Sequence, residues 1–287
     1  EITDCTSFLQ AVRDGGIVGL GGAAFPTWAK FNEATNPDYK VDTVLINAAE
    51  CEPYITSDHR MMLEHPDWIA DGIEYLRTYM NEYLGNATFK ICIETNKADA
   101  IEVLEKTFAG KDYVVVHKLK TIYPQGAKQV MLYNATGRVA VAGRRFPSFG
   151  ALIINVSSLA LMANYLNTGM PLVERIVTVD GPAVAQPMNL IAPIGTRISE
   201  LLKVTGLKAE PGKVVVGGPM NGTAIYSVDD PMVKVSNAVL VFDEKTAVLR
   251  EASACINCGR CMEKCPVRIS VADVDRAMKI KNADAKA

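Results

Sequence analysis

The first half of the chain alternates strand-like with helix-like segments, and this alternation constrains the fold more than any other feature. Apolar runs typical of buried strands lie at residues 41–47, 89–94, 113–116 and 152–156. Segments with helical periodicity lie at residues 4–13, 67–83, 98–108, 125–136 and 157–166. Strands that alternate with helices favour a parallel sheet covered on both faces. The sequence therefore predicts an α/β, Rossmann-like sheet domain over residues 1–170.

The second part of the chain has a different pattern. Two β runs, residues 175–181 and 214–218, flank one helical stretch at residues 197–205. Strands grouped around a single helix are typical of a small α+β module. We predict such a module over residues 171–245, followed by a helical segment over residues 246–287.

Near its carboxyl end the chain carries four closely spaced cysteines followed by a proline: Cys255, Cys258, Cys261, Cys265 and Pro266. Gaps of two, two and three residues form the ligand run of a ferredoxin-type [4Fe–4S] cluster, because the short loops let the thiolates converge on iron. A disulfide cluster is the alternative. A chain of 287 residues can build a core without such staples, and its other three cysteines are scattered. We therefore predict that the four cysteines are metal ligands and that the protein transfers single electrons.

The overall composition excludes several classes of function. The formal net charge of -2 leaves no basic excess to release phosphate counterions, so no nucleic-acid partner is predicted. No apolar run reaches the ~18 residues that a membrane span requires. No charged-then-apolar leader opens the sequence, and free cysteines beside a cluster motif fit a reducing compartment. We expect a cytoplasmic protein with no membrane span of its own.

A glycine-rich loop precedes a helix-like turn that begins near Pro26. Its candidate ligand-binding residues are Gly19, Gly21, Gly22, Ala23, Ala24 and Phe25. Glycines let backbone amides approach a ligand closely, and the helix that follows presents its positive end to a phosphate. Lys30, one turn into that helix, adds a full charge. The loop is not the dinucleotide fingerprint, because Ala24 occupies the third glycine position, and by itself it also fits an ordinary tight turn.

Three further loops follow predicted strands. Asn47, Glu50 and Glu52 come directly after the first strand and offer an amide and two carboxylates to ligand hydroxyls, unless they form a solvated acidic turn. The other two loops contribute Tyr123, Gln125, Gly126, Asn155 and Ser158. These residues also suit plain connections or helix N-caps. Because the carboxyl ends of parallel strands meet at one sheet edge, the four loops together predict one sizeable ligand.

Together these strings resemble the C subunits of Rnf electron-transport complexes. That family is in turn similar to the flavin-bearing, NADH-oxidising subunit of respiratory complex I. The likeness rests on GLGGAAFPTWAK at 19–30, VLINAAECEPYITSDHR at 44–60, YPQGA at 123–127, INVSS at 154–158, GGPM at 217–220 and the cysteine quartet. It covers nearly the whole chain, and the string NAAECEPY is highly specific.

The resemblance implies a cofactor and its site. FMN would be held by the glycine loop with Lys30, by the loop from Asn47 to Glu52 and by Asn155, and the nicotinamide of NADH would stack over the flavin. Phe25, Glu50 and Glu52 are then expected to favour NADH over NADPH, because an acidic pair repels the extra 2′-phosphate. The α+β module would be the β-grasp (SLBB-like) ligand-binding module found in both families.

The resemblance also implies a role and partners. The chain would exchange electrons between NAD(H) and iron–sulfur clusters as part of a membrane-bound complex that couples ferredoxin:NAD oxidoreduction to sodium or proton transport. Its partners would be NADH or NAD, the other subunits and, indirectly, ferredoxin, and it would lie peripherally on the inner face of the bacterial cell membrane. Flavin and cluster form a coherent pair, because flavin converts electron pairs into single electrons. Such chemistry needs no catalytic nucleophile or general base.

Three departures from the family pattern stand out. Ala24 replaces a usual glycine, Lys128 stands where an acidic residue is common, and only one cysteine quartet is present. In two-cluster ferredoxins the fourth cysteine of each run ligates the other cluster. We therefore expect two clusters in a full-length family member, and an incomplete or absent cluster in this chain.

Two alternatives remain open. A cobalamin reductase of bacterial microcompartments shares the flavin and cluster plan and differs in its substrate, which the sequence does not reveal. A non-catalytic docking subunit would hold no cofactor in its loops, and Lys128 and Ala24 are its best support. His59, His65 and His117 are isolated in the sequence and are predicted to be surface or capping residues.

Overall fold

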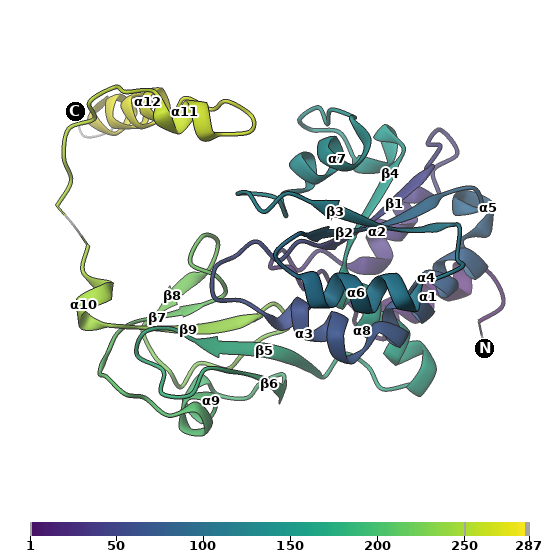
Figure 1. Ribbon diagram of the computed structural model, residues 1–287, viewed down its shortest axis with the longest axis horizontal. Helices are drawn as coiled ribbons and strands as arrows, with labels where there is room; N and C mark the ends of the chain where they lie inside the picture. The colour runs from purple at the N-terminus through teal and green to yellow at the C-terminus, as the bar shows by residue number, and fades with distance from the viewer. Residues whose placement is uncertain (1, 250, 285–287) are drawn as a thin grey trace. The chain divides into compact units, whose positions relative to one another are not determined.

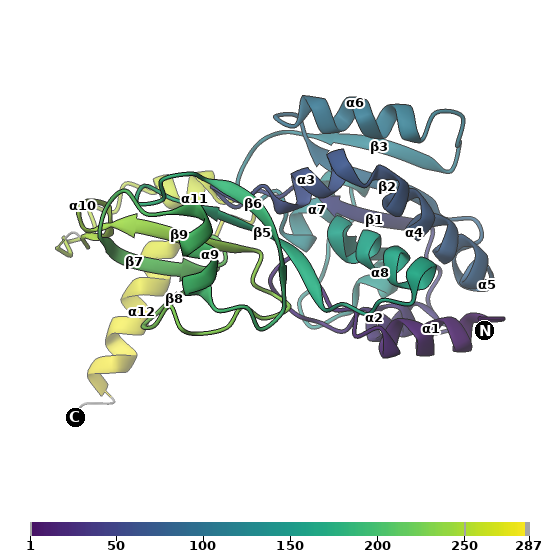
Figure 2. The ribbon, with the colours of Figure 1, turned by 90° about the horizontal axis from the view of Figure 1, so that it is seen from below.

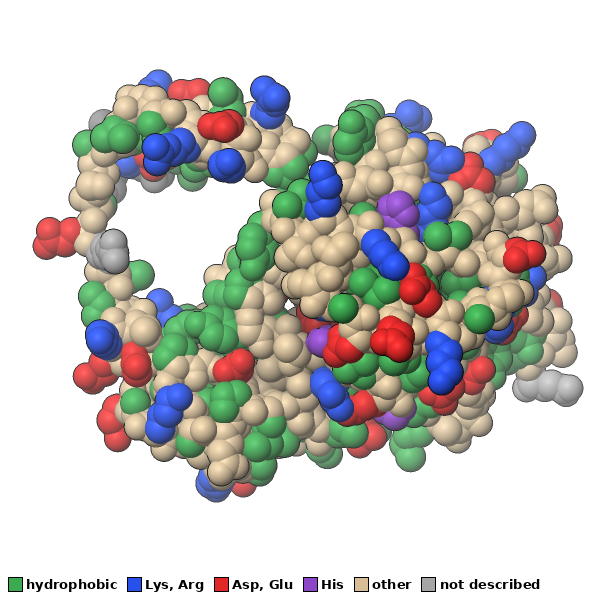
Figure 3. All heavy atoms as spheres, viewed as in Figure 1, with side chains coloured by type: hydrophobic (Ala, Val, Ile, Leu, Met, Phe, Trp, Pro, Cys, Tyr) green, Lys and Arg blue, Asp and Glu red, His purple; other side chains and the backbone are tan. Residues whose placement is uncertain are grey.

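The structure is a computed structural model that describes residues 2–249 and 251–284. One compact unit extends to Ala247, and a second begins at Val248. The first unit contains a four-stranded and a five-stranded sheet (Figures 1 and 2). On the face of this unit that Figure 3 draws, acidic and basic side chains are interspersed. Among the residues described, no helix is both long and apolar enough to cross a membrane.

The first sheet is parallel, with the strand order β3-β2-β1-β4. Its strands are β1 (Thr43–Ala48), β2 (Thr88–Glu94), β3 (Val114–Leu119) and β4 (Ala151–Asn155). The strand β4 pairs with β1 on the side opposite to β2, and its register places Asn47 beside Asn155. The strand order therefore reverses between β1 and β4, which is the point where open α/β sheets bind their ligands.

Helices cover both faces of the first sheet, which confirms the predicted parallel α/β architecture (Figure 1). They are α1 (Cys5–Asp14), α2 (Thr27–Ala34), α3 (Ser57–Glu64), α4 (Pro66–Tyr79), α5 (Asn81–Leu84), α6 (Ala98–Thr107), α7 (Lys128–Thr136), the 3-10 helix η1 (Phe146–Phe149) and α8 (Val156–Thr168). Val44 and Ile46 of β1 point into the larger core, which contains α4 and α8. Leu45, between them, points into the smaller core on the other face with Met131 and Leu132 of α7. This alternation is the period of two that a strand imposes on its side chains.

Two helical segments differ from the sequence prediction. The helix expected over 67–83 is two helices, because Met80 leaves the helical conformation between α4 and α5. Ile69, Ile73 and Leu76 form the expected apolar stripe of α4 and are fully buried. The helix α3 was not predicted, because it lacks a helical apolar stripe and has no side-chain cap at Thr56.

The second sheet is mixed, with the strand order β6-β5-β9-β7-β8. Its strands are β5 (Glu174–Asp180), β6 (Met188–Pro193), β7 (Pro211–Val216), β8 (Thr223–Ile225) and β9 (Ala238–Asp243). One face packs on helix α9 (Ile198–Thr205) through Leu201 and Leu202. The other face packs on Ile55, from the loop that follows β1. The expected combination of strands around one helix is confirmed, and β6, β8 and β9 are additions to the sequence prediction.

The second unit follows the short helix α10 (Glu244–Ala247) and contains the cysteine quartet. Its helices are α11 (Arg260–Lys264) and α12 (Val271–Asp284). No side chain described between Val248 and Ile280 is fully buried. The segment therefore has no apolar core of its own within the described residues.

Candidate cofactor site

A cavity of about 600 Å³ lies at the carboxyl ends of β1 and β4, where the strand order reverses. Ligand pockets typically measure roughly 300–1,000 Å³, so its size suits a mononucleotide. The predicted residues that line it are Gly21, Gly22, Ala23, Asn47, Glu50, Glu52, Gly126 and Asn155. The structure thus brings all four predicted loops together. The remaining predicted residues, Gly19, Ala24, Phe25, Lys30, Tyr123, Gln125 and Ser158, are not in the cavity lining.

The glycine loop closes on itself beside the cavity. The Gly19 N–H donates to the Phe25 carbonyl oxygen at 2.9 Å, and the Ala24 N–H donates to the Gly19 carbonyl oxygen at 3.2 Å. Gly22 has a φ of 104°, and no atom lies within 4 Å of the position that a β-carbon would take there. The backbone of Gly22 is therefore open to a ligand. Ala24 has a φ of 51°, a left-handed conformation that glycine adopts more easily.

Ser158 and Asn155 hold the glycine loop in place. The Ser158 hydroxyl accepts a hydrogen bond from the Leu20 N–H at 2.9 Å and lies 3.2 Å from the Val18 carbonyl oxygen, to which it donates. The Asn155 side chain caps α8 by accepting from the Ser158 N–H at 3.0 Å. Ser158 therefore positions the loop from behind, whereas Asn155 reaches the cavity.

The loops after β1 and β3 are joined to each other. The Asn47 side-chain amide donates to the Gly126 carbonyl oxygen at 3.0 Å, and the Gly126 N–H lies 3.3 Å from the Cys51 sulfur that accepts it. Burial raises the pKa of the Cys51 thiol. Gln125 is buried and accepts from the Asn134 side chain at 2.7 Å, so it faces α7. Tyr123 is 59% exposed and lines a neighbouring polar cavity.

Glu50 and Asp58 form a pair of carboxylates in the cavity wall. The Glu50 oxygens accept the Asp58 N–H at 2.6 Å and the His59 N–H at 3.0 Å, so Glu50 caps α3. Asp58 accepts from the Asn155 side-chain amide at 2.6 Å and from the Ser157 hydroxyl. Burial, and then the charge of Asp58, raise the pKa of Glu50 well above its usual value, and burial raises the pKa of Asp58.

Sequence reasoning missed Asp58 as a site residue. The available signal was its position eight residues after Glu50, in the same strand-end string. What the sequence could not reveal is that Glu50 turns back to cap α3, with a φ of 45°.

Two buried cations lie near this acidic pair. The Lys97 amino group donates to the Ala49 carbonyl oxygen at 2.7 Å, and Lys97 is only 6% exposed. Lys97 was not predicted as a site residue from the sequence. The Arg175 guanidinium donates to the carbonyl oxygens of Ile176 at 3.1 Å and Lys234 at 2.5 Å. Burial lowers the pKa of Arg175 to about 10, against the opposing effect of the Asp58 charge. Both cations lower the pKa of Asp58 and so oppose its burial.

Two lysines lie in the first turns of α2 and α7. Lys30, in the first turn of α2, is partly buried, and burial followed by the charge of Lys128 lowers its pKa to about 8. Lys128 is exposed and is the first residue of α7. Lys128 therefore adds positive charge near Lys30. An anion bound between these helix starts would relieve the repulsion between the two lysines.

The second sheet supplies the remaining wall of the cavity. Its contribution comes from residues 216–223, between β7 and β8, and residues 233–237, before β9. Glu52 contacts the first of these loops: one carboxylate oxygen accepts the Met220 N–H at 3.0 Å and the other accepts the Asn221 side-chain amide at 2.7 Å. Loops from the two sheets therefore meet at this wall of the cavity.

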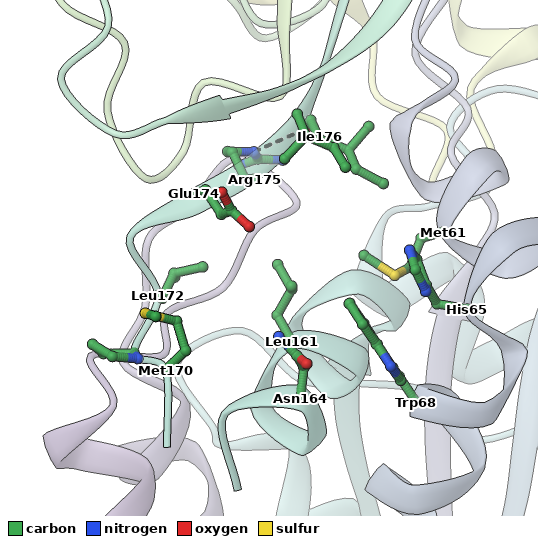
Figure 4. A pocket seen from close by; sticks show the side chains of 12 residues that line it. Met61, His65, Trp68, Leu161, Asn164, Met170, Leu172, Glu174, Arg175 and Ile176 are labelled. Carbon is green, nitrogen blue, oxygen red and sulfur yellow. Dashed lines mark hydrogen bonds between the residues drawn. The ribbon is translucent and has the colours of Figure 1, made fainter. Parts of the chain in front are cut away.

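A smaller cavity of about 50 Å³ lies between α3, α4, α8 and β5 (Figure 4). Trp68 stacks on His65 there with ring centroids 3.8 Å apart, and the Arg175 side chain lies at its edge. This space is too small for a nucleotide cofactor. His59, which lines the neighbouring polar cavity, pairs with Asp99, and the ring nitrogen lies 2.8 Å from the carboxylate oxygen.

The cysteine quartet lies in the second unit. Cys255, Cys258 and Cys261 are exposed and Cys265 is partly buried. Within residues 2–249 and 251–284, no three His, Cys, Asp or Glu side chains come close enough to hold a metal ion. The chemistry of the donor set nevertheless fits an iron–sulfur cluster, because four thiolates at this spacing are its usual ligands.

Comparison with known families gives two matches. Residues 12–164 match the family model of the Nuo51 FMN-binding domain, which spans the first sheet and all four of its loops. Residues 250–269 match the model of a 4Fe-4S binding domain and contain the whole quartet.

Several curated proteins are similar along nearly the whole chain. The C subunit of the proton-translocating ferredoxin:NAD(+) oxidoreductase complex of Clostridium ljungdahlii is 37% identical over 91% of this chain and 56% of its own length. The C subunit of the Na(+)-translocating complex of Acetobacterium woodii is 36% identical over 94% of this chain and 60% of its own length. The C subunit of an ion-translocating oxidoreductase complex of Yersinia pestis is 38% identical, with 92% and 42% covered. The chain thus spans about half the length of these relatives.

Among solved structures, an NAD+-reducing [NiFe]-hydrogenase in its H2-reduced state has a similar fold. The superposition has a TM-score of 0.70 at 21% sequence identity and covers 84% of this chain and 47% of the hydrogenase chain. At that identity the likeness concerns the fold alone.

Proposed function

The chain belongs to the family of the Nuo51 FMN-binding domain, and from that premise we propose that it binds FMN and exchanges electrons between NAD(H) and iron–sulfur clusters. The observation that carries this proposal is the cavity of about 600 Å³ at the strand-order reversal, lined by four loops that were selected from the sequence. Bound flavin supplies the conversion between an electron pair and single electrons. The chain itself has to bind, orient and shield the reactants.

The residues around the cavity suit FMN. The open backbone at Gly22 and the amides of Gly21 and Ala23 can approach a phosphate without side-chain obstruction. Lys30 and Lys128 lie at the starts of two helices and supply positive charge for the same group. The side-chain amides of Asn47 and Asn155, which line the cavity, suit the ribityl hydroxyls.

We also propose roles for the residues that the resemblance assigned to the nucleotide. Phe25 and Glu50 would favour NADH over NADPH, the carboxylate by repelling an additional phosphate. The raised pKa of Glu50 makes its charge depend on pH, so this selectivity should be strongest when Glu50 is ionised. Glu52 was expected to contribute to the same selectivity. Its two hydrogen bonds to Met220 and Asn221 also connect it to the loop between β7 and β8.

In the second unit, we propose that Cys255, Cys258, Cys261 and Cys265 are iron–sulfur ligands, the first three for one [4Fe–4S] cluster and Cys265 for the second cluster of a full-length family member. Support comes from their spacing and from the match of residues 250–269 to a 4Fe-4S binding domain. The proposed division of labour is an FMN and NADH domain over residues 1–170, a β-grasp module over 171–245 and the cluster segment from 246 onward.

The relatives support a role in a larger assembly. We propose that the chain is part of a membrane-associated ferredoxin:NAD oxidoreductase complex coupled to ion transport, as the names of its relatives state for them. Its partners there would be NADH or NAD, the other subunits and, indirectly, ferredoxin. Its place would be the cytoplasmic face of the bacterial cell membrane.

Flavin binding tests the proposal most directly. Titrating the chain with FMN should quench the flavin fluorescence. Gly22→Val should weaken that binding at least tenfold, because a branched side chain would occupy the open space beside the backbone. Circular dichroism and the melting temperature would report whether the fold is kept.

Gly110→Val provides a matched control. Gly110 also has a positive φ, of 80°, and open space around its α-carbon, but it lies in the turn after α6 and not in the cavity lining. Both variants carry the same kind of backbone strain. Equal FMN affinity in the two variants would refute the cavity as the flavin site.

A further inference from the structure

Glu52 links the two sheets of the first unit. It lies in the loop after β1, and both of its carboxylate oxygens accept hydrogen bonds from residues that are far away in the chain. The donors are the backbone N–H of Met220 at 3.0 Å and the side-chain amide of Asn221 at 2.7 Å. Hydrogen bonds to an ionised acceptor are stronger than neutral ones. One side chain therefore attaches a whole loop of the second sheet to the first.

The attached loop, residues 217–222, is built to lie close to Glu52. It connects the antiparallel strands β7 and β8, and the Gly222 N–H closes it by donating to the Gly218 carbonyl oxygen at 2.7 Å. Gly217 has a φ of 92°, which only glycine adopts without strain. A β-carbon added at Gly218 would overlap the Glu52 carboxylate. The absence of a side chain at this position is what lets the backbone approach Glu52.

The base of the Glu52 loop is also fixed against the second sheet. Ile55 is 5% exposed and packs on Val215 and Leu240, on the face of the sheet opposite to α9. The Thr56 N–H donates to the Thr178 hydroxyl at 3.1 Å. These contacts bury the base of the loop, whereas the hydrogen bonds of Glu52 lie at an exposed rim. Glu52 is therefore the side chain of this segment that connects residues 217–222 to the loop after β1.

We propose that Glu52 is a positioning residue that latches residues 217–222 over the cavity, so that this loop forms a fixed wall and slows the release of the bound ligand. The latch itself follows from the contacts above. Its effect on retention rests on the proposed function, with FMN as the ligand. The rival role for Glu52 is direct hydrogen bonding to nucleotide hydroxyls, for which the partnership with Asn221 would be irrelevant.

Hydrogen–deuterium exchange on the FMN-free full chain tests the latch without any ligand. In Glu52→Ala the exchange of the fragment that contains Met220 should accelerate about tenfold, as the loss of a hydrogen bond to a charged group predicts. Asn221→Asp should accelerate it as well, because two carboxylates then face each other. Asn96→Ala, an exposed residue of the neighbouring polar cavity, is the control and should leave the fragment unchanged.

The double variant E52Q/N221D distinguishes a latch from general loosening. It exchanges donor and acceptor: the new side-chain amide at position 52 donates to the new carboxylate at position 221, and its oxygen still accepts the Met220 N–H. Exchange in this variant should return to within about threefold of the original rate, a rescue that a purely destabilising change would not give. If N221D is not rescued by E52Q, or if Glu52→Ala leaves the fragment protected, the latch is refuted.

The same variants test ligand retention. The FMN dissociation rate, followed by the recovery of flavin fluorescence on dilution, should rise about tenfold in Glu52→Ala and Asn221→Asp and return toward the original value in E52Q/N221D. An unchanged dissociation rate in both single variants would refute the control of retention. If the unsubstituted chain binds no FMN, the proposed function fails, and the exchange experiment still decides whether the latch exists.

Discussion

The cavity in the first unit and the cysteine quartet in the second both contain residues in a strained, left-handed backbone conformation. They differ in the contacts that keep the backbone in that conformation. Among the described residues, the non-glycine residues with positive φ are Ala24, Glu50 and Tyr54 around the cavity and Asn257 and Arg268 around the quartet. A left-handed conformation costs an ordinary residue about 1–2 kcal/mol and persists only where the surroundings impose it. Both sites therefore need an external constraint on the backbone.

At the cavity, the protein itself provides that constraint. Lys97 donates to the carbonyl oxygen of Ala49, and Ser158 accepts from Leu20, so buried side chains fix the strained loops from behind. The loops are also tied to one another, as in the bond from Asn47 to Gly126. This half of the molecule is pre-organised for a ligand, which lowers the ordering cost of binding.

At the quartet, few contacts among the described residues perform this task. The Asn257 N–H lies 3.4 Å from the Cys255 sulfur, and the Arg276 guanidinium lies 3.3 Å from the Asn257 side-chain oxygen, both at exposed positions. Metal–thiolate bonds couple the folding of such segments to the binding of the metal. The fold therefore shapes the cavity by itself, whereas a bound iron–sulfur cluster would shape the cysteine quartet.

Removing one proposed cluster ligand should have the largest effect and should test whether the two sites are independent. After anaerobic reconstitution with iron and sulfide, Cys258→Ser should lose most of the iron that the unsubstituted chain binds, because Cys258 is one of the three thiolates proposed for the first cluster. The FMN affinity and the melting of the first unit should stay the same, since its core lies within residues 2–247. Iron content and FMN titration are the measurements.

Cys5→Ser is the matched control for this prediction. Cys5 is a partly buried cysteine of α1, outside the quartet, and its replacement should leave the iron content unchanged. A Cys258→Ser variant that keeps its iron would contradict the ligand assignment. A variant that loses iron and FMN together would contradict the independence of the two sites.

The acidic pair in the cavity wall should make stability depend on pH. The folded chain raises the pKa of both Glu50 and Asp58, so between the ordinary carboxyl pKa near 4 and the raised value it holds a proton that the unfolded chain has released. The free energy of unfolding must then fall as the pH rises through this interval. Burial, and then the charge of Asp58, raise the pKa of Glu50, so Asp58→Asn removes the second cause together with one of the two raised carboxyls and should reduce this fall.

Melting temperatures measured from pH 5 to pH 8 would check this effect. The melting temperature of Asp58→Asn, relative to that of the original chain, should increase as the pH rises. Asp112→Asn, at an exposed position before β3, is the control and should give no such trend. Parallel pH curves for the original chain and Asp58→Asn would show that the charges of Glu50 and Asp58 do not lower the free energy of unfolding.

The sequence allowed the strands of the first sheet and the meeting of their loops to be predicted, because both depend on local patterns. Val44, Leu45 and Ile46 form a continuous apolar run, and the carboxyl ends of parallel strands share one edge. The strand β9 was equally readable, since residues 238–242 are all apolar, but it was missed. The strand β6 gave no such signal, because it is only partly buried.

Other parts of the site depend on contacts that no local pattern contains. The helix α3 is capped by Glu50 from outside its own turn, so the usual N-cap signal is absent from the sequence. The contact between Glu52 and Asn221 joins residues 169 positions apart. Gln125 was selected as a ligand from its loop position, yet its side chain is buried against Asn134. Only the packing of the two sheets and α7 determines these three outcomes.

The strain at Ala24 should give the smallest and most specific effect. Ala24→Gly relieves a left-handed conformation that costs about 1–2 kcal/mol, against about 0.5–1 kcal/mol of additional chain entropy in the unfolded state. The expected result is a stabilisation of less than about 1 kcal/mol in urea unfolding. Ala23→Gly, at the neighbouring position where φ is not positive, adds only the entropy and should destabilise by about 0.5–1 kcal/mol. Opposite signs at two adjacent alanines would locate the strain in the backbone at Ala24, and equal signs would mean that the glycine loop does not hold Ala24 in the left-handed conformation.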